Sequence, residues 1–204
     1  MEWPALESDP EIFNRYFHSL GLEPEWEFTE IYEMSEEIMC SGLVLAYRRQ
    51  GDWRSFEGEP FTANFFIKQV KKLDNACGLL AGLHCILNSC AGISEGSLLE
   101  QLRDNIIGQP PEVAAQWLVG HESLKEAHRN FANEGQTQVT HKPKHHFIAL
   151  LPGMELYDGT KESPVKLGTF GFTQEFFTIV RNSIESNHIG PDISLMALRN
   201  LTLL

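Results

Sequence analysis

The sequence has little positive charge and no long run of apolar residues. Lys and Arg number 16 against 28 Asp and Glu, a formal net charge of −12. Nucleic-acid binding needs clustered Lys and Arg, so no nucleic-acid partner is expected, whereas an acidic surface suits a basic protein partner. No apolar segment approaches the roughly 18 residues of a membrane helix. The acidic start MEWPALESDPE lacks the apolar run of a secretory signal, so we expect no membrane segment.

Cysteine is scarce, and its spacing is unlike that of a metal site. The four cysteines are Cys40, Cys77, Cys85 and Cys90. No pair has C-x-x-C spacing, so a tetrahedral zinc site is not expected. Three histidines of one polar segment, His141, His145 and His146, have no nearby carboxylate to complete a ligand set. We therefore expect no metal, no cofactor, and free thiols in a reducing compartment, the cytoplasm or also the nucleus.

Repeats, low-complexity tracts and long linkers are absent as well. With 204 residues, 42% of them hydrophobic, the chain is expected to fold as one domain over residues 1–204. Periodicity predicts helices at Pro10–Leu20, from Cys77 onward, and at Gly96–Asn105, Pro111–Leu118, Glu122–Asn133 and Thr173–Asn187. It predicts strands at Trp26–Ile31, Leu43–Tyr47, Asn64–Ile67, His146–Leu151, Glu155–Asp158 and Ile193–Leu198. Helices grouped in the middle with strands on either side indicate an α+β fold with a mostly antiparallel central sheet flanked by helices.

Some of these elements have clear limits in the sequence. The first helix is expected to have Asp9 as its N-cap, Pro10 at its first position and Gly21 as its stop. Thr173 is expected to cap the last helix. The segment Arg48–Phe61, rich in Gly and Pro, is expected to be a surface loop.

The segment from residue 64 to residue 90 holds the most informative cysteine. Leucines and isoleucines recur there at three- and four-residue spacing, which predicts an amphipathic helix beginning at or near Cys77. Asp74 or Asn75 is expected to be its N-cap. Cys77 would lie at the positive end of the helix dipole, where the nucleophilic thiolate is favoured over the thiol. The alternative is that Cys77 is one more small buried apolar residue.

A nucleophilic cysteine needs a base, and the base needs an acceptor that orients it. His84 follows Cys77 on the same helix at a distance on the order of 10 Å, so it is expected to be a core histidine. His146 is the better candidate, because it opens a buried strand directly after a loop. A turn at Pro152–Gly153 would bring Asp158 beside His146, where it fixes the imidazole tautomer. Taken singly, His146 could be an ordinary strand-end residue and Asp158 an ordinary turn residue.

Acyl transfer also requires hydrogen-bond donors for the developing oxyanion. The backbone N–H of Cys77 at the start of the helix is one donor. Gln69, just before the turn that leads to Cys77, is the expected side-chain donor.

The order of these motifs resembles the ubiquitin C-terminal hydrolases, a family of papain-like cysteine peptidases. The shared pattern is Gln, Asn-Ala-Cys-Gly, Glu-Gly-Gln-Thr, His-Phe-Ile and Asp-Gly, and it extends through EAHRNFANEGQT, HHFIAL, ELYDG and ISLMALR. The resemblance runs nearly end to end and implies the short, single-domain type with a knotted α+β fold. It implies that Cys77 is the nucleophile, His146 the general base and acid, Asp158 the residue that orients His146, and Gln69 the oxyanion donor.

The resemblance also implies a loop that crosses over the active site and excludes bulky folded leaving groups. That loop would comprise Gln136, Thr137, Gln138, Val139, Thr140, His141, Lys142, Pro143, Lys144 and His145. Leu6 and Ile193 fall where the family has apolar residues in contact with ubiquitin, although each could equally be an edge of the core. The implied partner is ubiquitin or a related modifier, and the protein is expected to be a monomer.

Two spacings depart from the family pattern. Gln69 and Cys77 are eight positions apart, about two more than in the family, so Lys71 to Leu73 must bulge if Gln69 is to point at the site. The interval from His146 to Asp158 is about three residues shorter, which a tighter hairpin would absorb.

Three hypotheses follow from the sequence. The first is a thiol deubiquitinase that hydrolyses ester, thioester, amide and peptide bonds at the C-terminal glycine of ubiquitin. The second is a ubiquitin-binding module with weak or no catalysis, because of the longer Gln69–Cys77 interval. The third is a redox or metal protein that uses Cys77, Cys85, Cys90 and the loop histidines.

Overall fold

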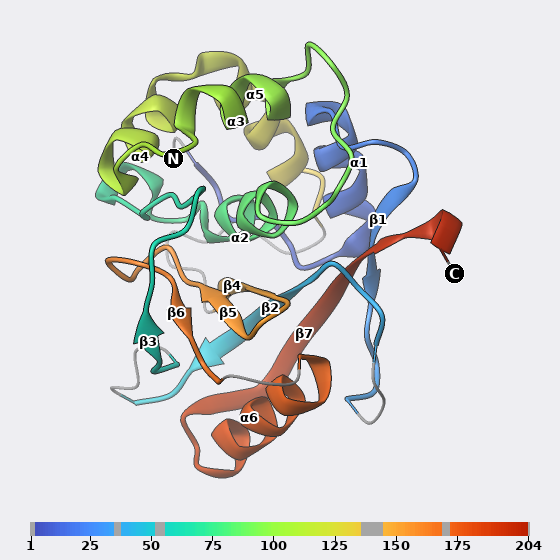
Figure 1. The fold of residues 1–204 in the computed structure, drawn as a ribbon, viewed down its shortest axis with the longest axis vertical. Coiled ribbons are helices and arrows are strands. Elements are labelled where there is room, and N and C mark those ends of the chain that lie inside the picture. The colour runs from blue at the N-terminus through green and yellow to red at the C-terminus, as the bar shows by residue number, and fades with distance from the viewer. Residues whose placement is uncertain (1–2, 35–37, 52–55, 136–144, 169–171, 204) are drawn as a thin grey trace.

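The computed structural model describes residues 3–34, 38–51, 56–135, 145–168 and 172–203. In these residues, a seven-stranded sheet lies between a large group of helices and the single helix α6 (Figure 1). Every strand pair is antiparallel, which confirms the α+β fold expected from the sequence. Among the helices of the described residues, none has the length and apolar character needed to span a bilayer.

The strands lie in the order β1-β7-β2-β4-β5-β6-β3. Their bounds are β1 (Trp26–Glu30), β2 (Gly42–Arg49), β3 (Glu59–Pro60), β4 (His145–Leu151), β5 (Glu155–Tyr157), β6 (Val165–Lys166) and β7 (Ile189–Asn200). β2 pairs with β7 on one side and β4 on the other, and it is buried from Gly42 to Tyr47. The two-residue strands β3 and β6 pair with each other; they were not expected, because so short a strand leaves no periodic signal.

The helices lie close to their expected positions. Their bounds are α1 (Pro10–Leu20), α2 (Cys77–Leu87), α3 (Leu98–Ile106), α4 (Pro111–Gly120), α5 (Glu122–Ala132) and α6 (Thr173–Glu185). The limits of α1 are confirmed in detail: Asp9 accepts a 2.7 Å hydrogen bond from the backbone N–H of Glu11, and Gly21 has a φ of 114°. Left-handed backbone of this kind favours glycine and ends a helix.

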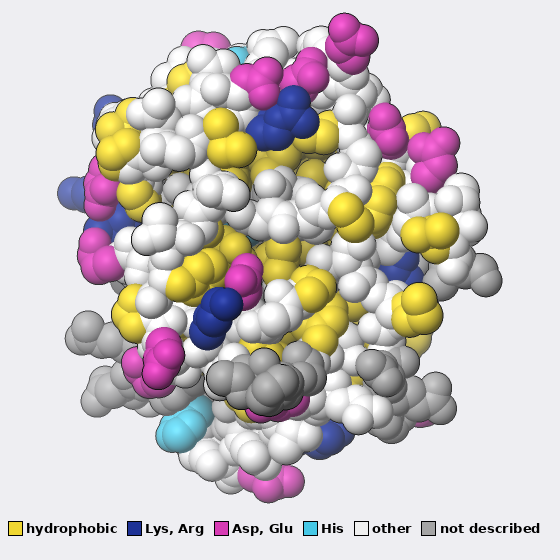
Figure 2. Space-filling model, viewed as in Figure 1, with side chains coloured by type: hydrophobic (Ala, Val, Ile, Leu, Met, Phe, Trp, Pro, Cys, Tyr) yellow, Lys and Arg dark blue, Asp and Glu magenta, His cyan; other side chains and the backbone are white. Residues whose placement is uncertain are grey.

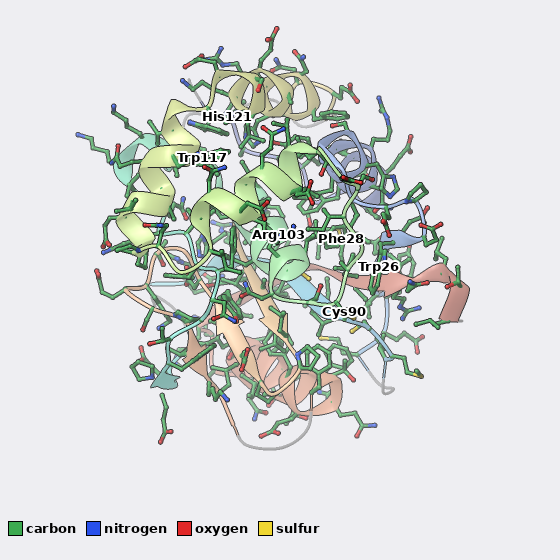
Figure 3. All side chains as sticks on the ribbon, turned by 45° about the horizontal axis from the view of Figure 1, so that its top comes forward. Trp26, Phe28, Cys90, Arg103, Trp117 and His121 are labelled. Atoms are coloured by element: carbon green, nitrogen blue, oxygen red, sulfur yellow. The ribbon has the colours of Figure 1, made fainter. Side chains whose placement is uncertain are left out.

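The sheet separates two hydrophobic cores, because successive side chains of a strand point to opposite faces. On β2, Val44 and Ala46 belong to the larger core beside α1 to α5, whereas Leu43 and Leu45 belong to the smaller core beneath α6. In Figure 3, Trp26 and Phe28 lie on β1, beside α1. Both are buried in the larger core, as expected from the alternation of this strand.

α2 is the central helix of the larger core, and it is buried on every side from Cys77 to Ile86. This differs from the amphipathic helix that the sequence predicts. Glycine allows the close packing: a β-carbon at Gly82 would lie 2.1 Å from the ring of Phe17 on α1. A β-carbon at Gly42 on β2 would lie 2.4 Å from the sulfur of Cys85. α2 therefore has little freedom to shift, and its first residue is held firmly.

Three local predictions were wrong. Asn64–Ile67 is not a strand, because the N–H of Ile67 bonds to the imidazole of His84 instead of to a neighbouring strand. The N-cap of α2 is Ala76, without a side-chain hydrogen bond, rather than Asp74 or Asn75. Thr173 does not cap α6, because its hydroxyl accepts a 3.1 Å bond from the N–H of Ile38.

A fourth expectation holds only in part. Within the expected loop Arg48–Phe61, Arg48 and Arg49 extend β2, and Glu59 and Pro60 form β3.

Candidate active site

Three elements bring a thiol, an imidazole and a carboxylate together. Cys77 is the first residue of α2, His146 is the second residue of β4, and Asp158 directly follows β5. Cys77 is 5% exposed, His146 is 9% exposed and Asp158 is fully buried. All three side chains are therefore largely removed from water, and electrostatic interactions between them are stronger than they would be in water.

The imidazole of His146 is held by Asp158. Its Nε2 lies 2.8 Å from Oδ1 of Asp158. The same oxygen accepts hydrogen bonds from the backbone N–H of Thr160 at 2.9 Å and from its hydroxyl at 2.7 Å. Since Nε2 faces the carboxylate, Nδ1 is the ring nitrogen left for the thiol of Cys77.

The short His146–Asp158 interval is explained by the hairpin. β4 and β5 pair directly, with Ala149 opposite Tyr157 and Leu151 opposite Glu155. The hairpin expected from the sequence is confirmed, and it places the start of β4 beside the end of β5.

The surroundings of His146 favour its protonated form. Burial lowers the pKa of His146, but the charge and hydrogen bond of Asp158, together with those of Cys77, raise it to about 9. An imidazolium beside a cysteine favours the thiolate. The arrangement can therefore hold an ion pair between sulfur and imidazole, with the carboxylate behind it.

His84 is a core histidine, as expected. Its Nε2 accepts a 3.0 Å hydrogen bond from the N–H of Ile67, and its ring stacks on Phe66 with centroids 5.1 Å apart. Burial lowers its pKa to about 3, although the charge of Asp158 and the bond to Ile67 act in the opposite direction. A neutral imidazole that already accepts a backbone hydrogen bond cannot act as the base.

Gln69 lies between the Asp158 turn and the segment before α2. Its backbone N–H donates to the carbonyl of Gly159 at 2.6 Å, and its side-chain amide donates to the carbonyl of Asp74 at 2.7 Å. Within the interval from Gln69 to Cys77, Lys71 to Leu73 form one turn of 3-10 helix. Asp74 therefore holds one N–H of the Gln69 amide. A side-chain amide has two N–H groups, so the other one remains as a possible donor.

The remaining predicted residues lie at the edge of this arrangement. Leu6 is 4% exposed, and a β-carbon on Gly78 would lie 3.2 Å from its β-carbon, so it is part of the core beside Cys77. Ile193 on β7 is half-buried and packs against the smaller core. Of the expected crossover loop, residues 136–144 lie outside the described residues. Its last residue, His145, lies in β4, and its Nε2 is 3.2 Å from the carboxylate of Asp192.

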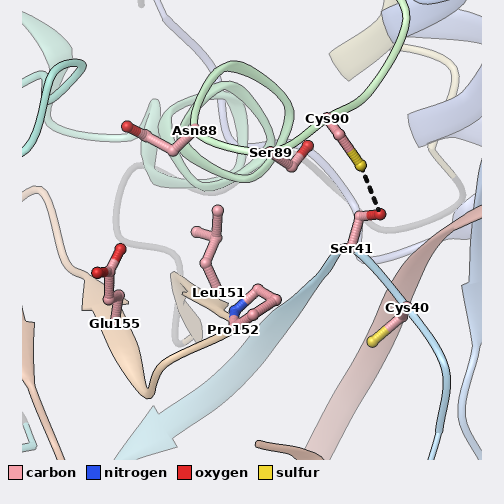
Figure 4. A pocket seen from close by; sticks show the side chains of 8 residues that line it. All are labelled: Cys40, Ser41, Asn88, Ser89, Cys90, Leu151, Pro152 and Glu155. Atoms are coloured by element: carbon pink, nitrogen blue, oxygen red, sulfur yellow. Dashed lines mark hydrogen bonds between the residues drawn. The ribbon is translucent and has the colours of Figure 1, made fainter.

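The other thiols lie at the far end of α2. Cys40, Ser41 and Cys90 help to line a cavity of about 310 Å³ (Figure 4). The sulfur of the exposed Cys90 lies 3.6 Å from the hydroxyl of Ser41. Burial raises the pKa of Cys40 to about 11, against the weaker effects of the Gly42 backbone and Arg199. Within the ranges that the structure describes, no three His, Cys, Asp or Glu side chains are grouped as metal ligands would be.

Two residues beside the site, Thr160 and Arg49, were not predicted from the sequence. Thr160 could have been found, because a threonine two residues after an aspartate often completes a turn with it. Arg49 comes within 3.9 Å of Oδ2 of Asp158 from β2. No local pattern indicates that contact, because it joins residues more than a hundred positions apart.

The free energy of unfolding is expected to fall as the pH is lowered from 6.5, because His84 and His128 stay neutral in the folded chain. Burial lowers the pKa of His84 to about 3; burial also lowers that of His128 to about 4, although the Pro4 carbonyl partly opposes it. Unfolded histidines take up protons near 6.5, so this stability is complete above pH 6.5. Below it, each histidine costs up to about 1.4 kcal/mol per pH unit. Urea denaturation across this range measures the slope.

Matched variants assign that slope to buried imidazoles. His128→Gln is expected to make it shallower, whereas His188→Gln, at an exposed histidine, leaves it unchanged. An unchanged slope in His128→Gln contradicts the prediction.

The chain is similar to known proteins over most of its length. Residues 3–187 match the family model described as "Ubiquitin carboxyl-terminal hydrolase, family 1", peptidase C12. A ubiquitin carboxyl-terminal hydrolase of Drosophila melanogaster is 28% identical over 190 residues, covering 82% of this chain and 83% of the relative. Ubiquitin carboxyl-terminal hydrolase 3 of Arabidopsis thaliana is 28% identical over an alignment of 225 residues, covering 98% and 95%.

A solved structure of another protein has a similar fold. The catalytic domain of Trichinella spiralis UCH37, bound to ubiquitin vinyl methyl ester, superposes with a TM-score of 0.74 at 22% identity. The match covers 97% of this chain and 95% of that one. With its fold and its family match in agreement, the chain belongs to the ubiquitin carboxyl-terminal hydrolases of peptidase family C12, and it is a thiol protease of the deubiquitinase class.

Proposed function

We propose that this protein hydrolyses ester, thioester, amide and peptide bonds at the C-terminal glycine of ubiquitin, with Cys77 as the nucleophile. The observation that carries the proposal is the 2.8 Å hydrogen bond between His146 and Asp158, with Cys77 acting on the same imidazole, at the junction of α2, β4 and β5. His146 is the general base and acid, and Asp158 orients it.

The proposed reaction has two steps. In the first, the thiol proton moves to Nδ1 of His146, and the sulfur attacks the glycine carbonyl. The tetrahedral intermediate then expels the amine, alcohol or thiol, which takes the proton from His146, and an acyl-enzyme remains. In the second step, His146 takes a proton from water, and the hydroxide attacks the thioester. Ubiquitin is released with a free carboxylate, and Cys77 regains its proton.

The oxyanion of both steps is proposed to bind at the start of α2 and at Gln69. The cap of α2 has no side-chain acceptor, so the first N–H groups of the helix, including that of Cys77, are not taken up by a capping side chain. The Gln69 amide is oriented by its bond to the Asp74 carbonyl, which leaves its second N–H as the proposed donor.

Ubiquitin is the proposed partner because the chain belongs to this family and because the T. spiralis relative was solved with a ubiquitin derivative. The formal charge of −12 is consistent with attraction of a basic partner. Acidic side chains are spread over the face shown in Figure 2, from the helices at the top to the region of α6 at the bottom. Leu6 and Ile193 are proposed contacts. Gln136 to His145 is proposed to cross the site and limit leaving groups to small adducts or short unfolded peptides.

The setting of the reaction is also a proposal. We propose that residues 1–204 act as a single catalytic domain, as a monomer and without a cofactor. The described structure contains four free cysteines, which suits a reducing compartment such as the cytoplasm or nucleus.

A second candidate function is ubiquitin binding with weak or no catalysis. The observation that favours it is the bond between the Gln69 amide and Asp74, which uses one of the two N–H groups of the expected oxyanion donor. This candidate predicts binding of ubiquitin without turnover of a fluorogenic ubiquitin C-terminal substrate.

Covalent labelling distinguishes the two functions. Ubiquitin bearing a C-terminal electrophile is expected to form one adduct per chain, and mass spectrometry is expected to place it on Cys77. Cys90→Ser, at the exposed thiol, is expected to label equally well. An adduct on another cysteine contradicts the proposal, and so does binding of ubiquitin without any adduct.

A further inference from the structure

We propose that Arg49 is a positioning residue for the reaction and acts through Asp158. The inference rests on the proposed function of Cys77, His146 and Asp158, and it adds a residue to that arrangement. Arg49 is the last residue of β2, the strand whose Tyr47 ring also packs edge-on against the ring of His146.

An irregularity in the sheet sets the position of Arg49. The pairing of β2 with β7 shifts register between Tyr47 and Arg49. Such a bulge turns a side chain away from the regular alternation of the strand, and bulges are frequent next to active sites. At this bulge the guanidinium of Arg49 extends toward the turn after β5.

Arg49 contacts both the carboxylate and the threonine that holds it. Its Nη2 lies 3.9 Å from Oδ2 of Asp158 and donates to the hydroxyl of Thr160 at 3.4 Å. The hydroxyl of Thr160 in turn donates to Oδ1 of Asp158 at 2.7 Å, the oxygen that faces His146. Arg49 therefore reaches one carboxylate oxygen directly and the other through Thr160.

The charge of Arg49 matters because the carboxylate of Asp158 is fully buried while the charge on His146 changes during the reaction. When His146 carries the proton, imidazolium and carboxylate compensate each other. When His146 gives its proton to the leaving group, the carboxylate loses the positive charge of the imidazolium beside it, and keeping its own charge buried then costs more. A guanidinium keeps its charge throughout, so Arg49 holds the carboxylate in the position that orients His146, both when His146 is protonated and when it is neutral.

The effect is expected in kcat more than in stability. The side chain of Arg49 is 34% exposed, and its distance to Asp158 is long for an ion pair, so its removal should change folding little. The guanidinium of Arg49 contacts Asp158 and Thr160 rather than Cys77, so substrate binding should also change little.

Kinetics on a fluorogenic ubiquitin C-terminal substrate tests the inference. Arg49→Met, which keeps the length of the side chain but not its charge, is expected to lower kcat about fivefold with KM within about twofold. Arg49→Lys is expected to recover part of the loss, because the ammonium restores a charge. Arg48→Met, at the exposed neighbouring arginine, is the matched control and is expected to behave as the wild type.

A double variant shows whether Arg49 acts through the carboxylate of Asp158. In Asp158→Ala, a further change of Arg49 to Met is expected to have no additional effect, because the two side chains belong to one interaction. The inference is overturned if Arg49→Met lowers kcat by the same factor in Asp158→Ala as in the wild type. It is also overturned if the kcat of Arg49→Met equals that of the control variant Arg48→Met.

A second measurement decides the inference even if the wild type fails to release ubiquitin. Iodoacetamide alkylation of Cys77, followed by mass spectrometry, reports thiolate reactivity without ubiquitin, and the exposed Cys90 is an internal reference. Arg49→Met is expected to slow alkylation of Cys77 relative to Cys90 by about fivefold. In the Asp158→Ala background, the ratio of the two alkylation rates is expected to be the same with Arg49 and with Met at this position. Absence of hydrolysis in the wild type would contradict the proposed function alone, whereas an unchanged alkylation ratio contradicts the role of Arg49.

Discussion

Cys77→Ala is expected to abolish hydrolysis of a fluorogenic ubiquitin C-terminal ester or amide while the fold survives. Loss of a nucleophile removes the covalent route altogether, and the expected fall in kcat is on the order of 10⁵-fold or more. The fold should tolerate the change because alanine is smaller than cysteine and the position is already apolar and 5% exposed. Release of the fluorophore measures activity, and a thermal melt shows that the variant is folded.

Two controls complete this experiment: a measurement of ubiquitin binding and a variant at another thiol. The Cys77→Ala variant is expected to bind ubiquitin as the wild type does, because the main chain at the start of α2 is unchanged. Cys90→Ala removes an exposed thiol in the turn that follows α2 and is expected to keep full activity. Full activity in Cys77→Ala would end the assignment of the nucleophile, and loss of activity in Cys90→Ala would place the chemistry elsewhere.

The sequence could predict the candidate site because each of its residues lies where an element begins or ends. Cys77 follows a polar turn and opens an apolar helix, and His146 opens an apolar strand after a loop. Asp158 follows the next strand, and the short hairpin between the strands brings it to His146. Such boundaries are visible in a local pattern, because turn residues and apolar runs mark them.

Contacts between distant segments could not be predicted in the same way. The cap of α2 was misplaced because Asp74 ends the preceding 3-10 turn, and its carboxylate accepts a hydrogen bond from the side-chain amide of Asn75 instead of from an N–H of α2. Asn64–Ile67 has the composition of a strand, but the imidazole of His84 takes the N–H of Ile67. The contact from Arg49 to Asp158 depends on a bulge in β2 and on the order of the strands in the sheet. The last two of these result from tertiary structure overriding a local preference.

The helical layer shows the same limit on a larger scale. The sequence predicts α4 and α5 as separate helices, and their positions are confirmed. Their junction is set by the rings of Trp117 and His121, whose centroids lie 4.6 Å apart (Figure 3). The imidazole of His121 also accepts from the N–H of Leu124 and caps α5. Histidine is not among the usual N-cap residues, so its role there was not expected.

Asp158→Asn is expected to lower kcat by roughly 10³- to 10⁴-fold and to change the pH profile of the reaction. Asparagine has nearly the same shape, so Thr160 can still donate to its side-chain oxygen. It has no negative charge, however, and the charge and hydrogen bond of Asp158 are the largest causes that raise the pKa of His146 to about 9. Without them, burial dominates, the pKa of His146 falls, and its imidazolium form is less populated near neutral pH.

The pH profile separates this explanation from simple loss of structure. In the wild type, the alkaline limb of kcat/KM is expected near pH 9, where His146 loses its proton. In Asp158→Asn that limb is expected to move to lower pH. The protonation of His146 also contributes to the free energy of unfolding, because His146 binds its proton more tightly in the folded chain than in the unfolded one. Its contribution is therefore complete below 6.5, lost as the pH rises through 9, and smaller in the variant.

Asp192→Asn is the matched control for this prediction. Asp192 is an exposed carboxylate that pairs with His145, the residue before His146 in β4. Its replacement removes the same charge from a neighbouring histidine but leaves Asp158 untouched, so kcat and the alkaline limb are expected to stay as in the wild type. If both variants shift the limb equally, the net charge of the protein sets the protonation of His146. If only Asp158→Asn shifts it, the buried carboxylate does, since a charge in solvent is screened and one at 2.8 Å from the ring in the protein interior is not.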